Sequence, residues 1–150
     1  PPFITIAQSM QASFAQGGVK VDLLPAAGSQ VYARVRAKQH QAAIRLWIPD
    51  YFDAHSNASA FAWNDGKSST VAGLNGWKIP ELTKATLAAV AEPDPAKRLD
   101  LYTKMQQELQ HNSPYVFVDQ GKTQIVVRDN VKGYQQGLNA DMVWYDRVTK

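Results

Sequence analysis

Residues 42–53, with the sequence AAIRLWIPDYFD, decide the fold that the sequence predicts. The first seven of these residues alternate in direction, with Ile44 and Leu46 on one side and Arg45 and Trp47 on the other. This period of two is typical of a β-strand. A proline and two aspartates follow the strand, so we expect the chain to leave it through a polar loop.

The segments before this strand predict a strand–helix–strand unit. Residues 19–23 alternate in the same way, and residues 29–38 have the spacing of a helix with Ser29 as its N-cap. Short connections in this order are typical of a parallel pair of strands with a crossover helix. We therefore predict an α/β fold with a mixed sheet flanked by helices.

Further elements are expected on both sides of this unit. A first helix over residues 4–16 should stop at Gly17-Gly18. Two helices are predicted over residues 80–91 and 94–111, with inward faces of Leu82, Ala85, Ala89 and Val90 and of Leu99, Tyr102, Met105 and Leu109. Asp94 should cap the second, with Pro95 at its first position. Strands are expected at residues 115–118 and 123–128, joined by a tight turn at Gly121.

Composition narrows the possible functions. The chain has 150 residues, enough for one domain with its own core, and a net charge of only +3. Its basic residues are scattered rather than gathered in a stripe, so we expect no nucleic-acid binding. There is no cysteine, and therefore no disulfide or thiolate zinc site. No apolar run approaches the roughly 18 residues of a membrane span.

The end of the strand at Trp47 is the best candidate for a binding site. In open α/β sheets, ligands bind outside the carboxyl ends of the strands. The indole of Trp47 offers a flat apolar wall with one donor, and the carboxylate of Asp50 can hold an ammonium group. The pattern equally allows a core tryptophan beside an aspartate in a turn.

The same loop suggests a chemical alternative. Asp50, Asp53 and His55 lie within six residues, and two carboxylates with an imidazole can bind a divalent metal. A small metal-dependent hydrolase is therefore a rival interpretation, although these residues also suit a polar loop that caps a helix near Ser56. The sequence contains no Gly-x-Ser-x-Gly motif, and we predict that the chain is not an enzyme.

The motif Trp47-x-x-Asp50-Tyr51-x-Asp53 resembles a signature of the family-5 extracellular solute-binding proteins, the oligopeptide-, dipeptide- and nickel-binding components of ABC importers. Other similar features follow in the family's order. They are Ala7-Gln8 with residues 17–21, the run from Pro93 through Arg98, Leu101, Tyr102 and Gln106 to Leu109, and residues 114–117 and 131–134. Five such features in order extend over almost the whole chain.

This resemblance implies the C-terminal part of lobe II of a longer protein with the type II periplasmic-binding fold. Residues 1–150 would form a single domain, and the last segment is allowed to return toward an N-terminal lobe I that this sequence lacks. In such proteins two lobes close on the solute, and the closed form docks on a membrane permease.

The resemblance also implies the site residues. The main chain around Leu46 and Ile48 would pair with a peptide backbone, Trp47 would wall the cleft, and Asp50 would take the α-ammonium group. The implied partners are a peptide or similar polar solute, the missing lobe and an ABC permease of the inner membrane. The implied protein is a periplasmic monomer without cofactor or metal. A stand-alone interaction domain remains a third interpretation.

Overall fold

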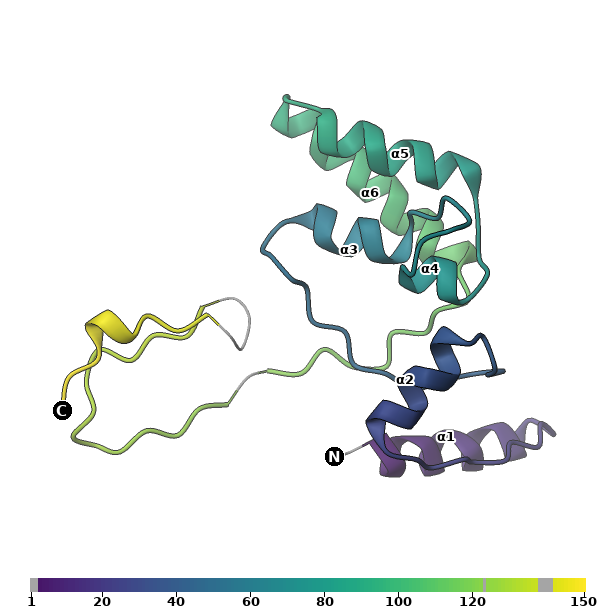
Figure 1. The fold of residues 1–150 in the computed structure, drawn as a ribbon, viewed down its shortest axis with the longest axis horizontal. Coiled ribbons are helices and arrows are strands. Elements are labelled where there is room, and N and C mark those ends of the chain that lie inside the picture. The colour runs from purple at the N-terminus through teal and green to yellow at the C-terminus, as the bar shows by residue number, and fades with distance from the viewer. Residues whose placement is uncertain (1–2, 123, 138–141) are drawn as a thin grey trace. The chain divides into compact units, whose positions relative to one another are not determined.

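The computed structural model describes residues 3–122, 124–137 and 142–150 and is helical (Figure 1). Helices make up 48% and strand positions 3% of the described residues, and these residues form no sheet. The predicted α/β fold with a mixed sheet is therefore wrong. The chain divides into two compact units, residues 1–47 and residues 48–150.

The first unit contains two helices, α1 (Phe3–Gln16) and α2 (Gly28–Arg36). The predicted stop after α1 is confirmed, because Gly18 has a φ of +78° and the Val19 N–H donates to the Phe14 carbonyl. The predicted cap of α2 is wrong. The N-cap of this helix is Ala27, two residues earlier and without a side-chain hydrogen bond, and Ser29 lies inside the first turn.

The two strands predicted on either side of α2 do not form. Residues 19–23 and 42–48 are not paired in any strand of the described residues, and no parallel pair joins them. Alternation shows that a segment suits an extended conformation, but a strand also needs a neighbour that accepts its hydrogen bonds. Val19 and Leu46 are more than half exposed, so these side chains do not belong to a buried face of a sheet.

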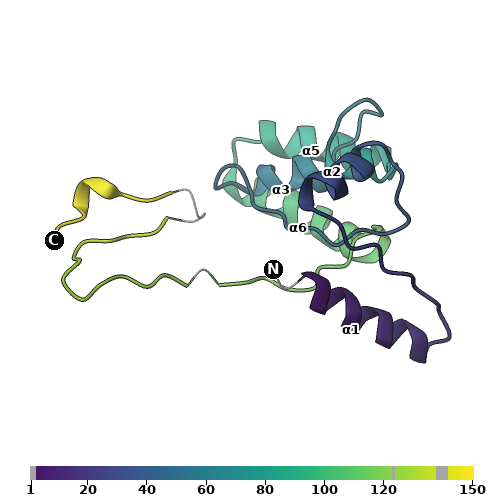
Figure 2. The ribbon, with the colours of Figure 1, turned by 60° about the horizontal axis from the view of Figure 1, so that its bottom comes forward.

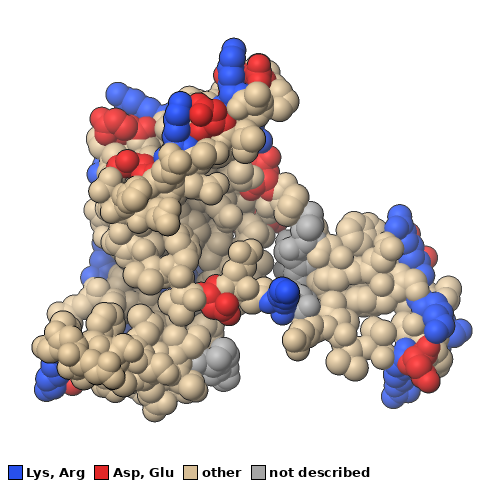
Figure 3. All heavy atoms as spheres, turned by 180° about the vertical axis from the view of Figure 1, so that it is seen from behind, with Lys and Arg blue, Asp and Glu red and all other residues tan. Residues whose placement is uncertain are grey.

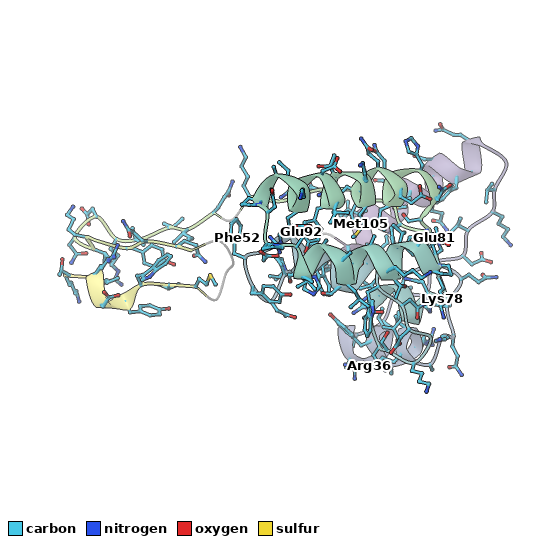
Figure 4. The ribbon with its side chains drawn as sticks, turned by 90° about the horizontal axis from the view of Figure 1, so that it is seen from above. Arg36, Phe52, Lys78, Glu81, Glu92 and Met105 are labelled. Carbon is cyan, nitrogen blue, oxygen red and sulfur yellow. The ribbon has the colours of Figure 1, made fainter. Side chains whose placement is uncertain are left out.

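The second unit is built on four helices, α3 (Ala54–Phe61), α4 (Val71–Leu74), α5 (Pro80–Ala91) and α6 (Pro95–Asn112). Figures 1 and 2 both show α5 and α6 side by side, with α3 packed against them. Their shared core consists of Ala58, Ala62, Leu82, Ala89, Tyr102, Met105 and Leu109. Met105 lies between α5 and α6 (Figure 4).

The limits of α5 and α6 follow the predictions closely. The Asp94 side chain accepts hydrogen bonds from the Ala96 and Lys97 N–H groups, so the predicted cap is confirmed. Two predicted core positions are wrong, because Val90 and Leu99 are exposed. Thr86 is buried instead. Its hydroxyl donates a hydrogen bond to the Leu82 carbonyl of the same helix, so the buried hydroxyl has a partner.

Beyond α6, the described residues lie mostly outside helices and paired strands. The strand predicted at residues 115–118 and the described part of the one at residues 123–128 have no ladder, and position 123 lies outside the described residues. Gly121 therefore joins no hairpin. Isolated antiparallel bridges link Lys132 to Thr149 and Gln136 to Val143, and a short 3-10 turn, η1, spans Tyr145–Arg147.

Candidate functional site

The candidate binding residues lie on an exposed, extended stretch. The boundary between the two units falls between Trp47 and Ile48. Leu46 is 62% exposed, Trp47 39% and Ile48 46%. Within the described residues, the main-chain groups of Leu46 and Ile48 have no backbone partner. The alternative of a core tryptophan does not hold at this exposure.

Asp50 begins the loop that leads into α3. Its main-chain N–H donates to the Ser56 hydroxyl at 3.2 Å, and Ser56 is buried in the first turn of α3. The Asp50 carboxylate is exposed and has no polar partner among the described residues. The main chain of this residue is therefore held while its charge is left available for a cation.

Asp53 has a structural role in the same loop. It is the N-cap of α3, and its Oδ1 accepts from the His55 N–H at 2.8 Å and from the Arg98 Nη2 at 2.6 Å. These hydrogen bonds, first that of Arg98 and then that of His55, hold the pKa of the Asp53 carboxyl below its ordinary value of 3.8. Asp53 is thus an ionised anchor for the start of α3.

Arg98 connects this anchor to the α5–α6 pair. Besides the Asp53 carboxylate, its Nε donates to the Ala89 carbonyl on α5 at 3.2 Å, and its Nη2 donates to the Tyr102 hydroxyl at 3.3 Å. The guanidinium carbon also lies 4.9 Å from the centre of the Tyr102 ring. The hydrogen bond to Asp53 raises the pKa of Arg98, and burial raises the pKa of Tyr102.

The metal-site interpretation gains no support from this geometry. Among the described residues, no group of three or more His, Cys, Asp or Glu side chains is placed to hold a metal ion. The carboxylate of Asp53 is already engaged by Arg98 and by the N-terminus of α3, which opposes its use as a base or metal ligand. The Nδ1 atom of His55 is buried without a hydrogen-bond partner in the described residues.

Sequence reasoning missed the residues that hold the site in place. Ser56, Arg98 and Tyr102 were not predicted as site residues, although Arg98 and Tyr102 belong to one of the family-like motifs. Their spacing of four places them on one face of α6, which a sequence can indicate. The contact between Arg98 and Asp53 spans 45 positions, and no local pattern indicates a contact of that range.

On the face shown in Figure 3, basic and acidic side chains are interspersed over the α5–α6 pair, without a broad area of one sign. In the part of the chain that the structure describes, no helix has both the length and the apolar character to cross a bilayer.

No protein family matches the chain, and neither a curated protein nor a solved structure matches it.

Proposed function

We propose that this chain is the ligand-binding lobe of an ABC-importer substrate-binding protein that captures peptides, or a similar polar solute, outside the cytoplasm. One observation carries the proposal. Trp47 and Asp50 are exposed, and Asp50 presents a carboxylate that no described residue neutralises. The support comes from these residues and not from the fold, since function belongs to sites rather than to folds.

The stretch offers three kinds of contact to a peptide. The main-chain groups of Leu46 and Ile48 have no backbone partner among the described residues, so their donors and acceptors suit a peptide added as a strand. Trp47 supplies a half-exposed apolar surface. Asp50 can pair with the α-ammonium group through a charge-assisted hydrogen bond.

Binding in this scheme requires no chemical step. The lobe supplies one side of the site, and closure against a second lobe excludes water from the other side. The charge pair at Asp50 becomes strong only when it is desolvated, because exposed ion pairs contribute little. The proposal therefore includes a second lobe, and it includes an ABC permease as the partner that receives the closed form.

The test uses the full-length product of the gene that encodes this sequence. We would expose it to a pool of di-, tri- and tetrapeptides with free amino termini and, separately, to the same pool after N-acetylation, and identify the retained members by native mass spectrometry. We expect retention of free-amine peptides only. Retention of neither pool, or equal retention of both, would contradict the proposal.

The substitution Asp50→Ala tests the residue that carries the proposal. Calorimetry with a retained peptide should show a loss of about 2–5 kcal/mol, because the ammonium group of the peptide would stay buried and unpaired. Asp119→Ala is the matched control, since it removes the same charge from another exposed extended position. Unchanged affinity in Asp50→Ala would exclude this role for Asp50.

A further inference from the structure

The loop that carries Asp50 is fixed at two points on the helical part of the second unit. The first is the hydrogen bond from the Asp50 N–H to the Ser56 hydroxyl. The second is the ion pair between Asp53 and Arg98, with an N–O distance of 2.6 Å. Between these points the Asp53 N–H donates to the Tyr51 carbonyl at 3.0 Å, which closes a tight turn.

The ion pair between Asp53 and Arg98 is partly shielded and its arginine is held by further hydrogen bonds. The side chains of Arg98 and Asp53 are 29% and 35% exposed, so both are partly shielded from water. Arg98 also donates to the Ala89 carbonyl and the Tyr102 hydroxyl, so its side chain is held in one geometry. An arginine held in this way loses little further side-chain entropy when it binds a carboxylate.

The contacts join three helices at one guanidinium group. Asp53 caps α3, Ala89 is near the end of α5, and Tyr102 is in the core side of α6. The start of α3 is therefore tied to the α5–α6 pair through Arg98, in addition to the apolar contacts of Ala58 and Ala62. Because Ser56 in the same turn of α3 receives the Asp50 N–H, the position of Asp50 depends on where α3 begins.

We infer that Arg98 is a positioning residue for ligand binding, which acts through Asp53 and the first turn of α3 to set the direction of the Asp50 carboxylate. The inference rests on the proposed function for its ligand but not for its geometry. Arg98 touches no ligand in this scheme. It reduces the freedom of the loop before binding, so that less ordering is needed when the ammonium group arrives.

The informative variant is Arg98→Lys. Lysine keeps the positive charge beside Asp53, but its single ammonium group cannot reproduce the planar fork that reaches Asp53, Ala89 and Tyr102 together. Arg128→Lys is the matched control, because it makes the same replacement at an exposed position. Both variants are made in the full-length gene product and compared with the unmodified protein.

Two readouts separate positioning from general stability. Hydrogen exchange of the Asp50 and His55 amides measures how firmly the loop and the α3 cap are held, since these N–H groups donate to Ser56 and Asp53. Retention of the free-amine and N-acetylated peptide pools measures the preference of the site for an ammonium group. In Arg98→Lys we expect faster exchange at both amides with unchanged protection in the middle of α6. We also expect the preference for free amines over acetylated peptides to fall about tenfold, which corresponds to about 1.4 kcal/mol.

The outcomes distinguish this inference from the proposed function. If the unmodified protein retains free-amine peptides and Arg98→Lys changes neither exchange nor preference, the positioning role is overturned while the proposed function stands. If exchange accelerates in Arg98→Lys but the unmodified protein retains neither pool, the loop is positioned as inferred and the proposed function fails. A global loss of protection in Arg98→Lys would show that Arg98 serves the fold as a whole, which also overturns the inference.

Discussion

At the scale of single residues, the loop between Asp50 and Ser56 separates two carboxylates by their surroundings. Asp50 is exposed and its carboxylate has no polar partner among the described residues, whereas Asp53 accepts hydrogen bonds from a guanidinium group and a helix N-terminus. The two residues are only three positions apart, but one is suited to bind a cation from outside and the other to hold the loop. Residue type alone would assign them the same role.

The lowered pKa of Asp53 predicts a pH dependence of stability. The folded protein resists protonation of Asp53, whereas the unfolded chain takes up the proton near the ordinary pKa of 3.8. The ion pair thus contributes fully above that pKa, and its contribution is lost as the pH falls through the lower folded value. Urea unfolding measured between about pH 5 and pH 2 should show a steeper loss of stability in the unmodified protein than in Asp53→Asn.

A shared part of this pH dependence should remain in both proteins. The pKa of the Asp65 carboxyl is also lowered, by hydrogen bonds from the Lys67 and Ser68 N–H groups, and Asp53→Asn leaves that turn intact. The free energy of unfolding should therefore fall with decreasing pH in both proteins, but less steeply in Asp53→Asn. Parallel curves for the two proteins would show that the Asp53 carboxylate contributes nothing to stability through its ionisation.

At the scale of elements, α5 has two faces that the sequence distinguishes only in part. Leu82, Thr86 and Ala89 face the core, whereas Leu87 and Val90 face outward despite their apolar side chains. Threonine occupies a core position because its hydroxyl bonds to its own helix and lies 3.6 Å from the Met105 sulfur. The helix is therefore oriented by its packing against α6 and α3, and not by hydrophobicity alone.

Two leucines on α5 provide a matched test of this orientation. Leu82 is 4% exposed and Leu87 is 55% exposed, so the same truncation removes core packing at one position and surface contact at the other. Leu82→Ala should lower the free energy of unfolding by about 2–5 kcal/mol. Leu87→Ala should change it by no more than about 0.5 kcal/mol. Denaturant titration measures both, and equal effects would mean that α5 packs through another face.

At the scale of the whole molecule, packing is concentrated in the helices of the second unit. The buried hydrophobic core joins α3, α5 and α6, whereas α1 in the first unit has no buried residue. The stretches that precede and follow these helices in the sequence, including residues 42–48 and 115–118, carry exposed apolar side chains such as Leu46, Val116 and Phe117.

Hydrogen exchange across the 150-residue chain would test this distribution. Amides in the middle of α5 and α6 should be the most protected, since their hydrogen bonds lie over the core. Amides of Leu46, Ile48 and residues 116–118 should exchange at nearly the rate of an unstructured peptide, because they have no backbone hydrogen-bond partner in the described residues. Strong protection of both segments would contradict the absence of a sheet from those residues.

The sequence by itself determined the elements whose signals are local. The limits of α5 and α6, the Asp94 cap and the stop at Gly18 follow from side chains and backbone preferences within a few residues of one another. The binding site on a strand end at Trp47 and Asp50 stays a prediction. The strand predicted there did not form. Alternating side chains are a property of one segment, whereas a β-ladder requires a second segment that accepts its hydrogen bonds.

Only the tertiary structure decided which distant groups meet. Asp53 and Arg98 are 45 positions apart, and their pairing depends on α3 and α6 sharing a core through residues such as Ala58 and Tyr102. Asp53, a candidate metal ligand in the sequence, is engaged by Arg98 and by the N-terminus of α3, whereas the Asp50 carboxylate is exposed. The physical reason is that local propensity acts over a single turn, whereas the partner of a charge is chosen by packing across the whole unit.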